Sequence, residues 1–276
     1  MILDMALRTE HLFIIEAFNS IFDFYWDEHY AYSGEYHDFP EIVYVADGEV
    51  EATENERIYH MKKGDWILHD AMEFHNIRSS GQTKPHVLIL SFHTPGIYPE
   101  NLKDGVFTLS DEEQNIFQDL FYRIYSAFYQ KKIPPYLRQG LALELSVFLI
   151  RLSSNQAQET KLSTNKSAQE YRKIVETMRS RLYDNITLSD LAKECHVSVS
   201  YIKNLFQNQI GISPKLFYTN LRRAEALRLL TAGISVGEVA ERMNFSSPNY
   251  FSLFMKKQLG MSISEYLKTK PTITLH

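Results

Sequence analysis

The sequence predicts an α+β protein of two domains, with a β-rich N-terminal part and an all-α C-terminal part. Short apolar runs separated by turn residues occupy positions 29–110, and helical periodicity replaces them from position 111 onward. The charge is divided in the same way. Residues 1–160 carry 12 Lys and Arg against 25 Asp and Glu, a net −13, whereas residues 161–276 carry 17 against 9, a net +8. The basic part is therefore the candidate for a polyanionic partner such as nucleic acid.

The composition excludes several classes of protein. The chain has 276 residues, of which 44% are hydrophobic and 23% are charged, as expected of a folded protein. Its one cysteine, Cys195, excludes an intrachain disulfide and a Cys-rich zinc site. Apolar runs stay well short of the ~20 residues that a membrane helix needs, and acidic residues interrupt the N-terminus where a signal segment would lie. We therefore expect a cytoplasmic protein with no membrane partner.

Three apolar runs in the first domain, residues 1–110, are typical of β-strands. They lie at 41–46, 66–68 and 85–92, and the turn signals Asp47-Gly48 and Gly64-Asp65 separate them. Several short strands with turns between them predict a sandwich or barrel.

Residues 111–152 are predicted to form a helical hairpin. Ser110 and Glu113 are placed as a capping box for a helix over 111–130, and a pair of prolines precedes a second helix over 136–152. Leu145, Phe148 and Leu149 make this hairpin more apolar than a surface element needs, which predicts a homodimer through the hairpin. The polar stretch 153–167 is predicted to be a linker.

The C-terminal domain, residues 168–276, contains an internal repeat. Residues 188–209 resemble residues 236–258, with an offset of 48 positions that becomes 49 after the turn. Each unit has a short capped helix, a tight connection and a second helix. This is helix-turn-helix geometry, in which the second helix can enter the major groove of DNA.

One face of each second helix carries polar side chains opposite the apolar face. Asn pairs with adenine and Lys with guanine, and an exposed Leu can meet a thymine methyl group, so these faces could contact base edges. The candidate DNA-contacting residues are Ser200, Lys203, Asn204, Gln207, Asn249, Ser252, Leu253 and Lys256. The alternative is a solvated helix face, which the duplication, the caps and the charge of +8 disfavour.

A helix predicted over 215–231 connects the two units. Its Arg222, Arg223 and Arg228 are spaced to reach phosphates or acidic partners, although for each one a surface salt bridge is the simpler interpretation.

Residues 186–257 resemble the AraC/XylS family of bacterial transcription regulators. The resemblance is carried by ITLSDLA at 186–192, SVSYIKNLF at 198–206, GISP at 211–214, LRRAEALRLL at 221–230, VAERMNF at 239–245 and YFSLFMKK at 250–257. Asn244, Met255 and Ile263 depart from the usual Gly, Phe and Pro. The resemblance implies a double-stranded DNA partner, transcription regulation, and RNA polymerase as a second partner if the protein is an activator. The family's base-contacting positions fall on Ser200, Lys203, Asn204, Asn249, Ser252 and Leu253.

The N-terminal domain resembles the cupin-type effector domain of the same family. His37, Glu41 and Gly48 follow the first cupin motif, and Gly64-Asp65 and His75 follow the second. Metal-dependent cupins have a His where this chain has Glu35. The resemblance therefore leaves two alternatives, an Fe, Mn or Zn site and the polar lining of a sugar-type pocket. We favour the second and expect no bound metal, no cofactor and no catalytic residue.

The expected effector is a small, sugar-like molecule. Aromatic side chains could stack on a sugar ring, and charged ones could bond its hydroxyl groups, although barrel core or interdomain packing would equally explain the aromatics. The candidate ligand-binding residues are His37, Glu41, Tyr44, Trp66, His75 and Arg78. A cupin metalloenzyme fused to a DNA-binding domain and a purely dimerising N-terminal domain remain as alternatives. The charge division further predicts that the acidic domain masks the DNA-binding face.

Overall fold

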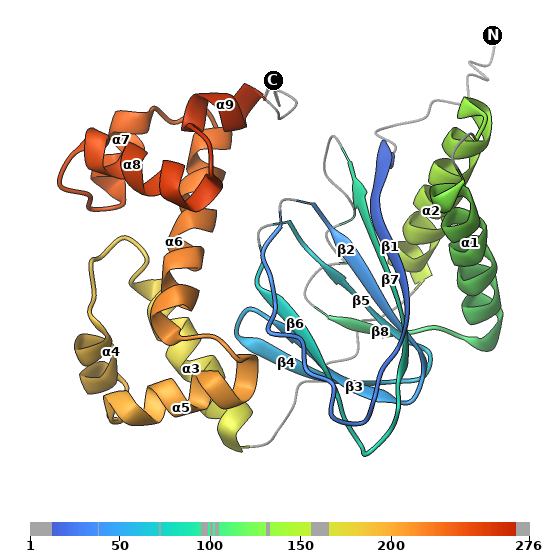
Figure 1. The fold of residues 1–276 in the computed structure, drawn as a ribbon, viewed down its shortest axis with the longest axis horizontal. Helices are drawn as coiled ribbons and strands as arrows, with labels where there is room; N and C mark the ends of the chain where they lie inside the picture. The colour runs from blue at the N-terminus through green and yellow to red at the C-terminus, as the bar shows by residue number, and fades with distance from the viewer. Residues whose placement is uncertain are drawn as a thin grey trace, which may run out of the picture.

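In the computed structural model the chain forms a β-sandwich flanked on one side by a helical hairpin and on the other by a helical domain (Figure 1). The described residues are 13–37, 39–71, 73–94, 99, 102, 105–130, 133–155 and 166–268. Most of the predicted linker 153–167 lies outside them, as do residues 269–276. The predicted α+β fold class with an all-α C-terminal domain is confirmed.

Two antiparallel sheets build the N-terminal domain. The five-stranded sheet has the order β1-β7-β2-β5-β8, and the three-stranded sheet has the order β4-β3-β6. The strand bounds are β1 Ala17–Tyr25, β2 Glu41–Asp47, β3 Glu49–Glu54, β4 Arg57–Lys62, β5 Asp65–His69, β6 His75–Ser79, β7 His86–His93 and β8 Val106–Thr108. The runs predicted at 41–46, 66–68 and 85–92 correspond to β2, β5 and β7.

The five-stranded sheet is apolar on both faces because each is covered. Alternate residues of a strand point to opposite faces. Val43, Val45 and Ile67 therefore point between the sheets, where they pack with Val50, Ala52 and other apolar side chains. The intervening residues point the other way and form the largest core of the protein with the helical hairpin.

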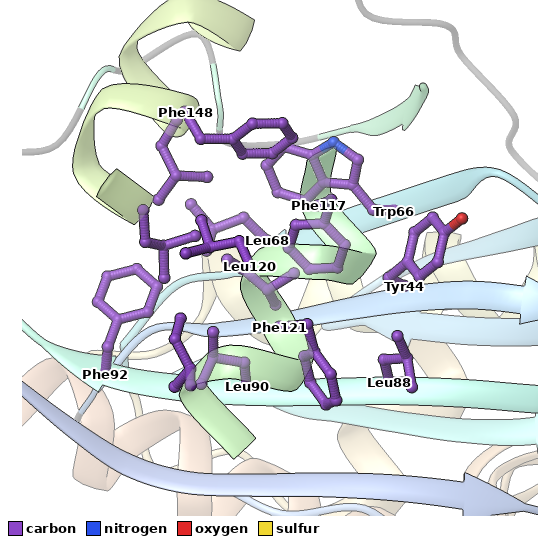
Figure 2. Close-up of a cluster of buried hydrophobic side chains, with 14 of the residues drawn as sticks. Tyr44, Trp66, Leu68, Leu88, Leu90, Phe92, Phe117, Leu120, Phe121 and Phe148 are labelled. Carbon is purple, nitrogen blue, oxygen red and sulfur yellow. The ribbon is translucent and has the colours of Figure 1, made fainter. Parts of the chain in front are cut away.

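The hairpin consists of α1, Asp111–Tyr129, and α2, Pro135–Asn155. The predicted capping box at the start of α1 is present, since Ser110 accepts from the Glu113 amide while the Glu113 carboxylate accepts from the Ser110 amide. Figure 2 shows Phe117, Leu120 and Phe121 of α1 and Phe148 of α2 packed over the sheet. Leu145, Phe148 and Leu149 are thus used within the chain, which explains their apolar character without a second copy.

The C-terminal domain follows the predicted repeat. Its helices are α3 Lys166–Ser180, α4 Leu188–Glu194, α5 Val199–Ile210, α6 Pro214–Thr231, α7 Val236–Arg242, α8 Pro248–Leu259 and α9 Ile263–Lys268. The first unit, α3 to α5 with the start of α6, has one apolar core, and the second unit, the end of α6 with α7 to α9, has another. Within the described residues, no helix is long and apolar enough to cross a membrane.

Candidate nucleic-acid interface and buried polar cluster

The two helix-turn-helix units have the same local geometry. In the first, Thr187 and Ser198 cap α4 and α5, and in the second, Ser235 and Ser247 cap α7 and α8. The turns contain equivalent residues with positive φ, His196 at 57° and Asn244 at 54°. Asn tolerates this conformation better than most residues, so the departure from the usual Gly leaves the turn intact.

Both second helices end in the same way. Gly211 and Gly260, 49 positions apart, close α5 and α8 in the left-handed conformation, with φ of 71° and 73°. The offset of 48 that becomes 49 therefore corresponds to one additional residue in the second turn.

The face predicted to contact bases is accessible on α5. Ser200, Lys203, Asn204 and Gln207 are all exposed, while Ile202, Leu205 and Phe206 are buried beneath them. Within the described part of the chain, these four side chains make no hydrogen bond or ion pair that would hold them against the protein. They are available to an external partner.

The equivalent face of α8 has the same character. Asn249, Leu253 and Lys256 are exposed and Ser252 is half-buried, over a core of Phe251 and Met255. Leu253 is 66% exposed, which is unusual for a large apolar side chain on a folded domain and is consistent with a contact that is not made within the chain.

The connecting helix α6 sets the spacing of the two units. It has 18 residues, so at 1.5 Å per residue it is about 27 Å long. Successive major grooves are roughly 34 Å apart on one side of DNA, a distance that two helices held at the ends of such a rod can match.

The arginines of α6 do not form the phosphate-contacting row that the sequence suggested. Arg222 is buried and donates to the carbonyl oxygens of Asp184, at 2.9 Å, and Met243 and to the Asn185 side chain, so it joins the two units. Its guanidinium also lies 4.9 Å from the ring centre of Phe245. Sequence periodicity missed this role because it depends on carbonyl groups far away in the chain.

The other two arginines are also engaged within the chain. Arg228 pairs with Glu225 of the same helix at 2.7 Å, which is the simple surface salt bridge. Arg223 lies over the ring of Tyr36 from the N-terminal domain, with 5.4 Å from its guanidinium carbon to the ring centre.

A second candidate site lies at one end of the space between the sheets. Ligand atoms of Glu35, His37, Glu41 and His75 all lie within 4.8 Å of one another. Glu41 Oε2 is 3.6 Å from His37 Nε2, and Glu41 Oε1 is 3.5 Å from His75 Nε2. The ring of His69 stacks on that of His75 at 4.6 Å. We call Glu35, His37, Glu41, His69 and His75 the polar cluster.

Burial and mutual contacts set the charges in the polar cluster. Burial alone would raise the pKa of Glu41, but His37 and His75 outweigh it and hold that pKa below its ordinary value. Burial lowers the pKa of His75, and Glu41 more than compensates, so the pKa of His75 is raised. Burial, reinforced by His75, keeps the pKa of His69 well below its ordinary value. Glu41 is therefore a carboxylate and His69 is neutral.

The polar cluster has unused hydrogen-bonding capacity. Both ring nitrogens of His37, Nε2 of His75 and Nδ1 of His69 are buried without a hydrogen-bond partner among the described residues. The Nδ1 atom of His75 lies 3.1 Å from the Glu73 carbonyl, a contact that aims Nε2 at Glu41. Two imidazoles and two carboxylates can bond a polyhydroxylated molecule or coordinate a divalent metal ion, with Glu35, His37, Glu41 and His75 as ligands.

The structure brings together only part of the predicted ligand set. His37, Glu41 and His75 converge, but Tyr44 and Trp66 lie on the opposite face of the five-stranded sheet (Figure 2). The Tyr44 hydroxyl donates to Gln114 at 3.3 Å and accepts from Gln118 at 3.0 Å, both on α1, while Trp66 stacks on Phe107. These two aromatics belong to the hairpin core.

Arg78 is also separated from the polar cluster. It binds Glu51 on the neighbouring strand and donates to the carbonyl of Asn208 in the helical domain at 2.9 Å. Strand alternation could have predicted all three placements. Tyr44, Trp66 and Arg78 each lie three positions from the polar-cluster residue on the same strand, and an odd separation puts two side chains on opposite faces. The same rule would have found His69, which sequence reasoning missed.

Comparisons with known proteins agree with this arrangement. Residues 21–106 match the AraC-like ligand binding domain family, and residues 191–269 match a helix-turn-helix domain family. Together the two matches cover more than half of the chain. The fold and its two exposed helix faces define a two-domain helix-turn-helix protein. The chain belongs to the AraC family of regulators.

Individual relatives match only in part. The transcriptional regulatory protein HptR of Staphylococcus aureus is 33% identical over 95 residues, which are 34% of this chain and 38% of that protein. The uncharacterized HTH-type transcriptional regulator YidL of Escherichia coli is 34% identical over 97 residues, which are 35% and 33% of the two chains. The match thus spans little more than a third of these curated relatives.

Solved structures also align with this chain, over nearly all of it or over a part of it. ToxT of Vibrio cholerae, in its apo form, aligns over 96% of this chain and 99% of its own, with 15% identity and a TM-score of 0.38. The C-terminal domain of AraT, a response regulator from Geobacillus stearothermophilus, aligns over 41% of this chain and 96% of its own, with 26% identity and a TM-score of 0.37.

Proposed function

We propose that the protein is a sequence-specific, double-stranded DNA-binding transcription regulator that responds to a small molecule. The observation that carries the first part is the exposed face of α5, which presents Lys203, Asn204 and Gln207 in a form that the second unit repeats on α8. Phosphate contacts would position the domain, and these faces would select the sequence.

The experiment that tests DNA recognition compares two duplexes. One is selected by the protein from a randomised pool, and the other is the same duplex with the selected bases scrambled. Asn204→Ala is expected to weaken binding to the selected duplex by about 1–3 kcal/mol and to leave the scrambled one unchanged. Asn115→Ala, on the exposed surface of α1, is the matched control. Equal weakening on both duplexes would contradict base recognition by Asn204.

We further propose that the effector binds at the polar cluster without being chemically converted. His37, His69 and His75 have buried nitrogens without a hydrogen-bond partner among the described residues, and together with the carboxylate of Glu41 they favour a ligand with several hydroxyl groups, such as a sugar. A divalent metal ion is the second candidate because the donor atoms lie within 4.8 Å.

Calorimetric titration with a panel of pentoses and hexoses, and separately with Zn²⁺ and Mn²⁺, distinguishes the two ligands. Glu41→Gln should abolish the heat of whichever ligand binds, whereas Glu49→Gln, on the outer surface of the three-stranded sheet, should not. If Glu41→Gln keeps the full heat of binding, the effector binds elsewhere.

We also propose a homodimer through the exposed face of α2. Tyr136, Leu143 and Val147 are 75%, 53% and 45% exposed and lie at spacings of seven and four residues on one side of that helix. Gly140 lies between them, and no atom of the described residues would lie within 4 Å of a Cβ atom there. An activator of this architecture would in addition contact RNA polymerase, and its DNA target implies the cytoplasm.

A further inference from the structure

The two domains share a core at the first helix-turn-helix unit. Phe74 and Ile58 of the N-terminal domain are buried in the same apolar cluster as Tyr171, Phe206 and Phe217 of that unit. The Phe74 ring meets the Phe217 ring edge to face, with 5.3 Å between centroids. No residue of the described N-terminal domain enters the core of the second unit.

Polar contacts surround this shared core. The Tyr171 hydroxyl donates to the carbonyl of Asn55 at 2.8 Å, and Arg179 pairs with Glu56 at 2.8 Å. Asn55 in turn makes two hydrogen bonds with the backbone of Phe74. Its amide donates to the Phe74 carbonyl, and its side-chain oxygen accepts from the Phe74 amide. The position of Phe74 is therefore fixed from both domains.

The segments that make this contact also carry the polar cluster. Glu35 and His75 form an isolated antiparallel bridge. The Glu35 amide donates to the His75 carbonyl at 3.0 Å, and the His75 amide donates to the Glu35 carbonyl at 3.3 Å. Along the first segment, Glu35 and His37 belong to the polar cluster, whereas Tyr36 between them contacts the helical domain. Along the second, His75 belongs to the polar cluster and Phe74 to the shared core. Each polar-cluster residue on these segments is thus one peptide away from an interdomain contact.

Tyr36 is held between the two domains. Its ring lies 5.2 Å from that of Phe74, and the Arg223 guanidinium carbon lies over the Tyr36 ring at 5.4 Å from its centre. Its hydroxyl oxygen is buried without a hydrogen-bond partner among the described residues, and burial raises its pKa. At Gly34, with φ of 86°, a Cβ atom would come within 2.5 Å of the Phe74 ring, so the segment packs as closely as glycine allows.

We propose that Tyr36 and Phe74 transmit the state of the polar cluster to the first helix-turn-helix unit, and not directly to the second. The proposal rests on the proposed effector site. A ligand that moves Glu35, His37 or His75 must move the peptides of Tyr36 and Phe74, and packed cores pass on such shifts because they deform little. The exposed face of α5 stays uncovered in this arrangement, so the coupling acts on the placement of the unit and not by masking its DNA-contacting residues.

Hydrogen–deuterium exchange of the full chain tests the proposal without DNA or an identified effector. Glu41 pairs with His37 and His75, which both belong to the N-terminal domain, so Glu41→Gln alters the polar cluster from within that domain. It should change exchange in α3, α5 and the start of α6 while leaving α7 to α9 unchanged. In a Tyr36→Ala background, the same substitution should no longer affect α3 and α5. Tyr25→Ala, an exposed tyrosine of β1, is the control background in which the effect persists.

A double-mutant cycle on DNA affinity gives the second readout. If Glu41 and Tyr36 act through one path, their effects on the dissociation constant for the selected duplex should be non-additive by about five-fold or more. Tyr36→Phe, which keeps the ring, should preserve the coupling if packing carries it. Additive effects, or equal exchange changes in both units, would overturn the proposal. If Glu41→Gln gives the expected exchange pattern but the wild-type chain selects no duplex from the randomised pool, only the proposed function would be overturned.

Discussion

Phe74 of the N-terminal domain and Phe217 of α6 pack edge to face across the domain boundary, with their ring centroids 5.3 Å apart. Phe74 is 1% exposed, although it lies in a connection between strands, because the helical domain covers it. The first helix-turn-helix unit therefore depends on the N-terminal domain for part of its core, and the second unit does not.

Phe74→Ala should consequently destabilise the first unit. Truncating a fully buried Phe costs roughly 3–5 kcal/mol, because both buried surface and packing are lost. We expect a lower thermal midpoint, with exchange increased in α3 and α5 before α7 and α8. Phe128→Ala, at a position of α1 that is 39% exposed, should change the midpoint little. An unchanged midpoint for Phe74→Ala would show that the two domains do not pack as described.

Arg222 provides a different kind of connection, between the two helix-turn-helix units. Its guanidinium donates to the Asp184 and Met243 carbonyls at once, which a lysine ammonium on a flexible stem cannot reproduce. Arg222→Lys should cost about 1–3 kcal/mol of stability and should weaken binding to a duplex that spans both units more than to one that spans a single unit. Arg123→Lys, in an exposed ion pair on α1, should cost less than about 1 kcal/mol. Equal losses in the two variants, measured by urea unfolding, would contradict this role.

The lowered pKa of Glu225 predicts that the stability of the protein depends on pH in the acid range. Burial would raise the pKa of its carboxyl, but hydrogen bonds from Arg228 and Tyr183 lower it below the ordinary value of 4.5. A carboxyl whose pKa is lowered in the folded state stabilises the protein at pH values above its ordinary pKa. This stabilisation is lost as the pH falls from the ordinary pKa through the lowered one. Thermal midpoints of wild type and Glu225→Gln measured from pH 7 down to pH 3 should therefore converge in acid. A difference that stays constant over this range would contradict the linkage.

These residues show what the sequence could and could not predict. The repeat, the caps at Ser198 and Ser247 and the exposed face of α5 follow from local pattern, because helix periodicity and capping act within a few residues. The placement of Tyr44 also had a local signal, since it lies three positions from Glu41 on one strand and must face the other way. Its aromatic ring alone suggested that Tyr44 binds the ligand, but Tyr44 faces the hairpin core.

The interdomain contacts had no such signal. Nothing within several residues of Phe74 or Arg222 indicates Phe217 or the Met243 carbonyl as a partner, because these contacts depend on how separate elements pack. The masking of the DNA-contacting face predicted from the charge division is also wrong for this arrangement. Lys203 and Asn204 stay exposed while the acidic domain contacts the far end of α5 through Arg78 and Asn208.

The proposed dimer depends on apolar side chains on the outer face of α2. Leu145, Phe148 and Leu149 are buried against the sheet, so the residues left for a second copy lie on the outer face of α2 and include Leu143 and Val147. A charge at each of these positions would be buried without a partner in a dimer but solvated in a monomer. The double variant Leu143→Glu, Val147→Glu should therefore sediment as a monomer at tens of micromolar, at which wild type sediments as a dimer.

The control and the DNA readout separate this effect from misfolding. Leu216→Glu introduces one such charge at an apolar α6 position that is 47% exposed, and it should leave the dimer intact. A monomeric variant that keeps its fold should bind a single DNA site as wild type does and should lose only the gain in affinity on paired sites, because dimerisation adds avidity without new base contacts. A wild-type chain that sediments as a monomer, or a double variant that remains dimeric, would show that this face of α2 is not the interface.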